Sequence, residues 1–166
     1  MALLNVIFKD YLLPSFYSFV ACAGFCFVCN IRGKQLLFAA LGGGIAWLAY
    51  LVTGPFVSNE TIRYFLAAVV FSAYAEIMAR IHRAPVTCYL LIALIPLVPG
   101  GGIYYTMEHC VNGDTQAFLE TGLHTLGLAG ALALGVVVVS TIFRLKLLTR
   151  LRRLFRPKES APPVEE

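Results

Sequence analysis

Charged residues are scarce in this chain of 166 residues: Asp, Glu, Lys and Arg together make up 13% of the sequence, whereas hydrophobic residues make up 59%. The mean hydropathy is +0.78. A water-soluble domain of this length cannot hide so much apolar surface, because its surface is large relative to its volume. The composition therefore excludes an ordinary soluble domain and predicts an all-α membrane protein, since each helix satisfies its own backbone hydrogen bonds in lipid.

Motifs typical of enzymes are absent as well. The sequence contains no HExxH, no GxxxxGK[ST] loop, no GxSxG and no pair of CxxC motifs. Cys22, Cys26 and Cys29 share one face of the first apolar run, and we expect them to pack rather than bind metal, because no His or acid joins them there. The basic residues that give the net charge of +4 lie in short loops and at the C-terminal end. We therefore expect no enzyme, no cofactor, no metal and no nucleic-acid partner.

Five apolar runs are long enough to cross a bilayer, which takes about 20 helical residues. They are Tyr11–Ile31, Gln35–Thr53, Ile62–Ala79, Val86–Met107 and Phe118–Phe143. We expect one five-span membrane domain over residues 1–156 and a disordered cytoplasmic tail over residues 157–166, which are rich in proline and acid.

The loops indicate the orientation of these five transmembrane helices. If the N-terminus lies outside, the external side receives only Lys9 and Arg63. The cytoplasmic side receives the eleven other basic residues: Arg32, Lys34, Arg80, Arg83, Arg144, Lys146, Arg150, Arg152, Arg153, Arg156 and Lys158. This asymmetry predicts an external N-terminus, a cytoplasmic C-terminus and a multi-pass protein of the cell (inner or plasma) membrane. The segment Arg144–Arg156 predicts either a basic amphipathic helix on the cytoplasmic surface or a continuation of the fifth span.

Small residues recur at four-residue spacing in two of the runs. Ala39 and Gly43 lie in the second run, and Gly127, Ala131 and Gly135 lie in the fifth. Such spacing lets helix backbones approach closely. These residues predict packing faces, either within the chain or against another subunit.

The fourth run is interrupted by the segment Pro96-Leu97-Val98-Pro99-Gly100-Gly101-Gly102. Proline removes a backbone donor and clashes with the preceding turn, and each glycine weakens a helix by about 1 kcal/mol. We therefore expect the fourth helix to be broken, with a new half-helix whose exposed amides attract a carboxylate at mid-membrane. The alternative is a kink that only improves packing. The predicted substrate-binding residues are Pro96, Pro99, Gly100, Gly101, Gly102 and Tyr105, although Tyr105 also suits the outer aromatic belt.

Three ionisable residues inside the runs are candidates for proton coupling. Glu76 is either a proton or substrate site or half of an ion pair with Arg80, four residues later. Glu120 and His124 also lie four residues apart, so they form either a proton relay or an interfacial polar face.

The P-L-V-P-G element in a fourth span, within a five-span module with a basic cytoplasmic end, resembles the threonine/serine exporter family. The resemblance is to the smaller module of that family and covers nearly the whole chain to about Phe155. It implies export of threonine and serine, or of a dicarboxylate such as succinate, together with a larger module that this chain lacks. Only Pro96, Pro99 and Gly100 correspond to the family motif.

The expected function is thus a subunit of a secondary transporter that exports small carboxylate-bearing metabolites as a hetero- or homo-oligomer in the lipid bilayer. The alternative is a membrane subunit that assembles or regulates a transporter without moving substrate. The small-residue packing faces, the small size of the chain and its basic C-terminal helix fit this second function.

Overall fold

The computed structural model describes residues 8–154, with side chains described for residues 8–145, and every regular element in this part of the chain is helical. The elements are a π-helical turn η1 (Phe8–Leu12), α2 (Leu13–Val28), α3 (Lys34–Thr53), α4 (Glu60–Ile81), α5 (Val86–Leu94), a 3-10 turn η2 (Ile95–Leu97), α6 (Gly100–Val111) and α7 (Thr115–Leu154). The predicted all-α fold is confirmed. The predicted tail, residues 157–166, lies outside the described residues.

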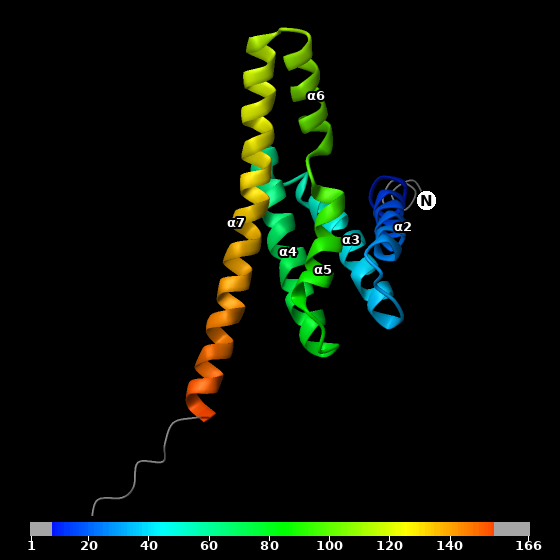
Figure 1. Ribbon diagram of the computed structural model, residues 1–166, viewed down its shortest axis with the longest axis vertical. Helices are drawn as coiled ribbons and strands as arrows, with labels where there is room; N and C mark the ends of the chain where they lie inside the picture. The colour runs from blue at the N-terminus through cyan, green and yellow to red at the C-terminus, as the bar shows by residue number, and fades with distance from the viewer. Residues whose placement is uncertain (1–7, 155–166) are drawn as a thin grey trace, which may run out of the picture.

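Four helical segments are long and apolar enough to cross a membrane: Phe8–Val28, Lys34–Thr53, Glu60–Ile81 and Thr115–Leu145. A fifth candidate is the pair Val86–Leu97 and Gly100–Val111, which is bent by 55° at its break. Successive helices run in opposite directions, apart from α5 and α6, which continue in the same general direction, so the loops after α2 and α4 and the C-terminal part of α7 lie at the same end of the bundle (Figure 1). This is the end with the basic loop residues. The orientation in a membrane stays a prediction.

Three helix ends differ from the runs predicted from hydropathy, because local capping decides them. Helix α2 ends at Val28 instead of Ile31, and Asn30 then adopts a φ of 55°. Helix α4 begins at Glu60 because the side chain of Asn59 accepts a hydrogen bond from the Thr61 amide at 3.0 Å. Asp114 likewise accepts from the Ala117 amide at 3.0 Å, so α7 begins at Thr115. Polar capping residues fall outside an apolar run and extend the helix beyond it.

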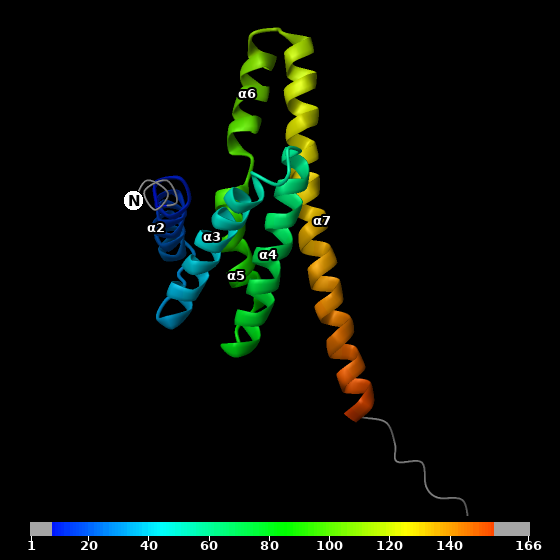
Figure 2. The same ribbon diagram turned by 180° about the vertical axis from the view of Figure 1, so that it is seen from behind.

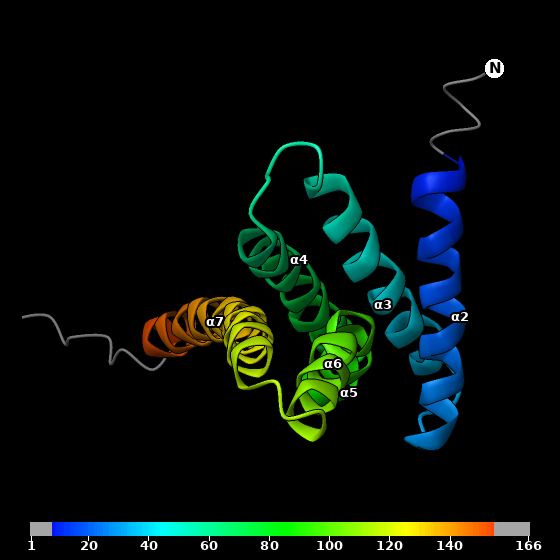
Figure 3. The ribbon, with the colours of Figure 1, turned by 90° about the horizontal axis from the view of Figure 1, so that it is seen from above.

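The helices pack as an arc with one helix set against it. Seen from above, α2, α3, α4 and α7 follow one another around the arc, and α5 lies against α3 and α4 (Figure 3). One buried cluster lies between α2, α3, α4 and α5, where Cys22 and Cys26 donate weak hydrogen bonds to the carbonyls of Ile92 and Leu36. These two cysteines therefore pack in the core as predicted, whereas Cys29 follows the end of α2 and is exposed.

Small residues set the distance between the packed helices. A Cβ atom added to Gly43 of α3 would overlap the side chain of Cys22, and Ser18 donates a hydrogen bond to the Gly43 carbonyl at 3.0 Å. On α7, Gly135 lies directly against α4, whereas Gly127 has open space around it. Of the small residues predicted to form a packing face on α7, Gly135 thus packs against another helix of the chain, whereas Gly127 is uncovered.

Helix α6 and the first turns of α7 form a hairpin that projects beyond the other helices (Figures 1 and 2). The hairpin leaves the bundle near Gly102, which lies against Thr125. At the same level His124 lies 3.5 Å from Glu60 at the start of α4. Helix α6 contains no buried residue, and apolar side chains such as Val111 are largely exposed. The bundle therefore has an uncovered apolar arm at the end opposite its basic loops.

Substitution of Gly135 should show how tightly α4 and α7 pack. A Cβ atom at this position would lie 2.5 Å from the Cβ of Ala68 and 3.0 Å from the Phe65 carbonyl oxygen. We expect Gly135→Ala to lower the free energy of unfolding by about 1–3 kcal/mol through overpacking. The matched control is Gly127→Ala, which meets open space and should leave stability unchanged or raise it by up to about 1 kcal/mol. Thermal unfolding of both variants in detergent checks this, and equal stability would contradict a tight contact.

Candidate functional site

The segment between α5 and α6 combines three different backbone conformations. Helix α5 ends at Leu94, and the amide of Val98 then donates to the Ile95 carbonyl at 3.3 Å in a 3-10 turn. Pro99 has φ −74° and ψ 59°, and the Gly100 amide donates to the Val98 carbonyl at 2.7 Å, which together form an inverse γ-turn. The chain changes direction by 55° across this segment.

The first turn of α6 offers fewer free amides than the sequence suggests. We expected all three glycines to present bare amides, but the γ-turn uses the amide of Gly100. The first bond of the helix runs from Ile103 to the Pro99 carbonyl at 3.2 Å. Within residues 8–154, the amides of Gly101 and Gly102 have no backbone or side-chain partner. These two amides, at the positive end of the α6 dipole, are the donors available to an anion.

The helix break packs against the rest of the chain on one side only. Leu97 is fully buried in a cluster with Ala68 and Phe71 near the middle of α4, which fixes the lower side of the break. A Cβ atom at Gly102 would overlap the hydroxyl of Thr125, so this glycine allows α6 to approach α7. Gly100 and Gly101, in contrast, are exposed and have no other group of the chain near the Cβ position.

The remaining predicted binding residues lie along the same element. Pro96 and Pro99 are partly buried at the two ends of the turn. Tyr105 lies one turn after Gly101, on the same face of α6, and is 56% exposed. Its ring meets that of Tyr104 edge to face at 5.5 Å. The structure thus places Tyr105 beside the open side of the break and shows no contact that would assign it to a site rather than to the aromatic belt.

The predicted Glu120–His124 pair is replaced by a different arrangement. His124 lies 3.5 Å from the carboxylate of Glu60, and Glu120 is exposed with no ion pair to His124 in the described chain. Glu60 also accepts a hydrogen bond from Tyr50 at 3.3 Å, and the guanidinium of Arg63 stacks on the Tyr50 ring at 4.3 Å. Sequence analysis missed Glu60 because it lies outside the apolar run, although an acid after Asn59 at a helix start is a recognisable signal.

Glu76 lies at the opposite end of the bundle, away from the helix break. Its carboxylate lies 3.5 Å from the guanidinium of Arg80, so the predicted i,i+4 pair forms. It also borders a cavity of about 830 Å³, whose lining on α5 is Val86, Thr87 and Leu90. Leu90 lies six residues before Pro96, or about 9 Å along a helix, and none of the predicted binding residues of the break lines the cavity. The structure therefore does not bring Glu76 together with the predicted binding residues of the break.

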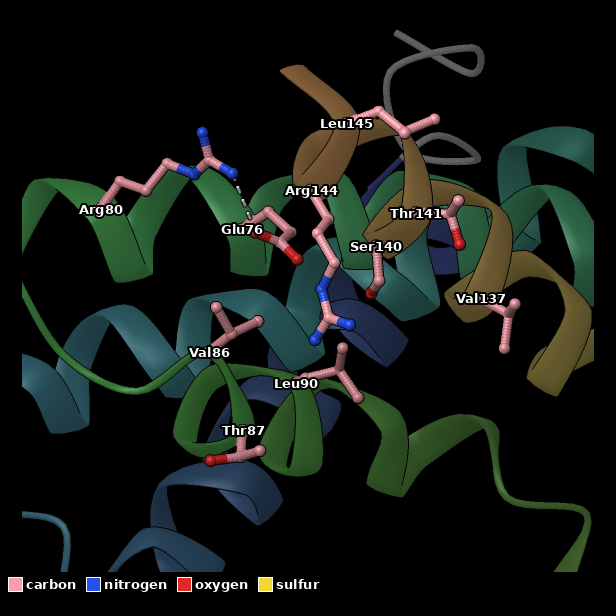
Figure 4. A pocket seen from close by; sticks show the side chains of 10 residues that line it. All are labelled: Glu76, Arg80, Val86, Thr87, Leu90, Val137, Ser140, Thr141, Arg144 and Leu145. Carbon is pink, nitrogen blue, oxygen red and sulfur yellow. Dashed lines mark hydrogen bonds and ion pairs between the residues drawn. The ribbon is translucent and has the colours of Figure 1, made fainter. Parts of the chain in front are cut away.

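The cavity beside Glu76 is formed by α4, α5 and α7 (Figure 4). Its lining contains two arginines, three hydroxyl side chains and four apolar residues besides Glu76: Arg80, Arg144, Thr87, Ser140, Thr141, Val86, Leu90, Val137 and Leu145. Sequence analysis counted Arg144 among the cytoplasmic basic residues and as the start of the basic C-terminal segment, and it did not single out the hydroxyls. The signal was the Ser140-Thr141 pair near the end of the fifth apolar run, three residues before Arg144.

These features define a helical protein whose long apolar helices suit a membrane and whose fifth candidate span is interrupted. A family model described as "Threonine/Serine exporter, ThrE" matches residues 14–142. Since this match covers more than half of the chain, the chain belongs to the threonine/serine exporter family, as the sequence resemblance predicted. Membership implies a role in transport rather than catalysis. No curated protein and no solved structure matches the chain.

A double-mutant cycle should measure how Glu76 depends on Arg80. Glu76 is only 8% exposed, and Arg80 also donates to the Phe143 carbonyl at 3.3 Å, so it ties α4 to α7. We expect Arg80→Gln to lower stability by about 1–3 kcal/mol, because it leaves a buried carboxylate without its cation. Adding Glu76→Gln should recover part of that loss. Thermal unfolding of the two single variants and the double variant checks this, and strictly additive effects would show that the pair is not coupled.

Proposed function

We propose that this chain is a subunit of a secondary transporter that exports small carboxylate-bearing metabolites, threonine and serine or a dicarboxylate such as succinate. The observation that carries the proposal is the interrupted α5–α6 helix in a chain that belongs to the threonine/serine exporter family. An interrupted helix leaves backbone groups unpaired at membrane depth, which is tolerated where they face protein or a wet cavity. Transporters use such ends to hold a substrate.

The free amides of Gly101 and Gly102 fit a carboxylate. They lie in the first turn of α6, where the aligned peptide dipoles favour negative charge. The absence of side chains at Gly100 and Gly101 leaves room for a ligand to approach the backbone. In this proposal Pro96 and Pro99 hold the turn, and Tyr105 borders the same open face.

The open side of the break also supports a partner. Within the described residues, no group of this chain approaches the Cβ positions of Gly100 and Gly101, and α6 has no buried residue. A substrate held there would need another wall. The proposal is that the larger module of the same family supplies it, and that the two modules form the transporter together in the cell membrane.

A second candidate function is a subunit that assembles or regulates a transporter without contacting substrate. The exposed apolar hairpin of α6 and α7 favours it, because such a surface suits contact with another membrane protein. The two candidate functions predict different efflux when this chain is missing or when its helix break is altered.

Efflux of labelled serine, threonine and succinate should be measured from cells that make this chain alone, the larger module alone, or both. We expect efflux only when both are present. Full efflux with the larger module alone would instead establish the regulatory function, and efflux of one substrate over the others would define the class.

A substitution at the break should separate transport from assembly. Gly100→Leu adds a side chain where the structure has open space, so the fold should tolerate it while the approach of a substrate to the amides is blocked. We expect efflux to fall at least about tenfold, the equivalent of about 1.4 kcal/mol, with unchanged amounts of the assembled pair in the membrane. Gly130→Leu on α7, which is also open, is the matched control. Normal efflux with Gly100→Leu would remove the break from the mechanism.

Proton coupling is proposed for Glu76, Glu120 and His124, and Glu60 joins them because of its contact with His124. A histidine beside a carboxylate can pass a proton to it or take one from it. We expect an imposed pH gradient to change the efflux rate and His124→Gln to weaken that response. Efflux that is insensitive to the gradient would exclude coupling while leaving transport itself intact.

A further inference from the structure

The cavity between α4, α5 and α7 holds charged and polar groups that the helix break does not use. It lies at the end of the bundle with the basic loops, which is predicted to be cytoplasmic, and has a volume of about 830 Å³. Apolar side chains from α5 and α7 cover part of its wall. A volume of this size is typical of pockets that bind small molecules.

The two arginines that line the cavity differ in the number of their interaction partners. Arg80 is engaged three times: with Glu76 at 3.5 Å, with the Phe143 carbonyl at 3.3 Å, and with the Phe143 ring at 4.8 Å. Arg144 forms no hydrogen bond or ion pair within residues 8–145. Figure 4 shows its side chain extending from α7 toward Leu90 and Val86 of α5. Arg144 is therefore the guanidinium available to a ligand.

The other polar groups that border the cavity form no hydrogen bond to Arg144 within residues 8–145. The hydroxyls of Ser140, Thr141 and Thr87 border the same cavity and form no hydrogen bonds in the described part of the chain. Glu76 uses one carboxylate oxygen for Arg80, and the other has no hydrogen-bond partner among residues 8–145. Glu76 and Arg144 thus border one cavity as opposite charges that are not paired with each other.

We infer that this cavity binds a small zwitterion, with its carboxylate on Arg144 and its ammonium group on Glu76. A guanidinium presents a planar fork that binds a carboxylate through two hydrogen bonds, and a largely buried carboxylate favours a cation. The hydroxyls of Ser140 and Thr87 are available for a polar side chain of the ligand. The inference rests on the proposed function only in taking this ligand to be a free amino acid such as serine.

A dicarboxylate in this position would place its second carboxylate beside Glu76, and like charges at a buried site are unfavourable. Arg80, which pairs with Glu76, offsets part of this repulsion, so the expected difference between a zwitterion and a dicarboxylate is one of relative affinity. The same holds for inorganic phosphate. A phospholipid headgroup with an ammonium group and a phosphate shares the chemistry of an amino acid, so the experiment must separate these two sources.

The test is binding of L-serine to the purified full chain in phosphatidylcholine nanodiscs, measured by isothermal titration calorimetry, with succinate and inorganic phosphate as comparison ligands. We expect serine to bind more tightly than either comparison ligand. Arg144→Gln should weaken serine binding about 10- to 100-fold, the effect of losing a hydrogen bond to a charged group. Arg32→Gln, an exposed loop arginine outside the cavity, is the matched control and should leave binding unchanged.

Glu76→Gln tests the orientation of the ligand. It should weaken serine binding and strengthen succinate binding, so that the preference between the two ligands reverses or disappears. A purely structural role for Glu76 would weaken both ligands alike. Serine binding that is equal in Arg144→Gln and the unaltered chain would overturn the inference.

Addition of phosphatidylethanolamine to the nanodiscs separates a solute from a lipid. We expect serine binding to persist there, whereas its loss would show that the cavity holds a headgroup and would overturn the inference. Efflux assays distinguish this failure from failure of the proposed function. Efflux that is unaffected by Arg144→Gln but lost in Gly100→Leu would support the proposed exporter function and exclude a role for this cavity in it. Serine binding without any efflux would support the cavity as a binding site and contradict the proposed exporter function.

Discussion

The close approach of α2, α3, α4 and α5, which their small side chains permit, is the constraint on which the rest of the structure depends. Alanine, cysteine, glycine and serine fill most of the buried positions between these helices. In lipid, packing of this kind replaces the hydrophobic effect, because lipid tails are as apolar as leucine. Ser18 and Cys22 add hydrogen bonds from α2 to carbonyls of α3 and α5. The result is a compact body that can hold an irregular segment in place.

The interrupted helix depends on this body on one side only. Leu97 is buried among residues of α3, α4 and α7, so the turn that follows it begins from a fixed point. Beyond that point α6 contacts α7 and leaves the other helices (Figure 2). Because the turn is anchored at Leu97 and open at Gly100 and Gly101, its free amides stay accessible. This arrangement supports the proposal that a second protein completes a binding site at the break.

Much of this architecture follows from the sequence, because long apolar runs and Pro–Gly segments have few structural solutions in a membrane. The all-helical fold and the helices were predicted on that basis, and the Glu76–Arg80 pair was one of the two alternatives that the i,i+4 spacing offered. The exact helix ends were not, since Asn59 and Asp114 act through local caps that hydropathy does not register. The contact between Glu60 and His124 and the cavity around Arg144 join residues more than sixty positions apart or from three helices. Such juxtapositions depend on how the helices tilt and cross, which no single run encodes.

Helix α7 runs unbroken from Thr115 to Leu154 and so behaves as a stiff rod that passes both regions of interest. Thr125 touches Gly102 at the helix break, and Arg144 borders the cavity at the other end. The nineteen residues between them span about 28 Å, close to the thickness of the hydrocarbon core. Between these points α7 lies against α4 at Gly135, and contacts at His124 and Phe143 tie it to α4 on either side. The helix break and the cavity are therefore held at a fixed separation along one continuous helix, so neither can shift along α7 independently of the other.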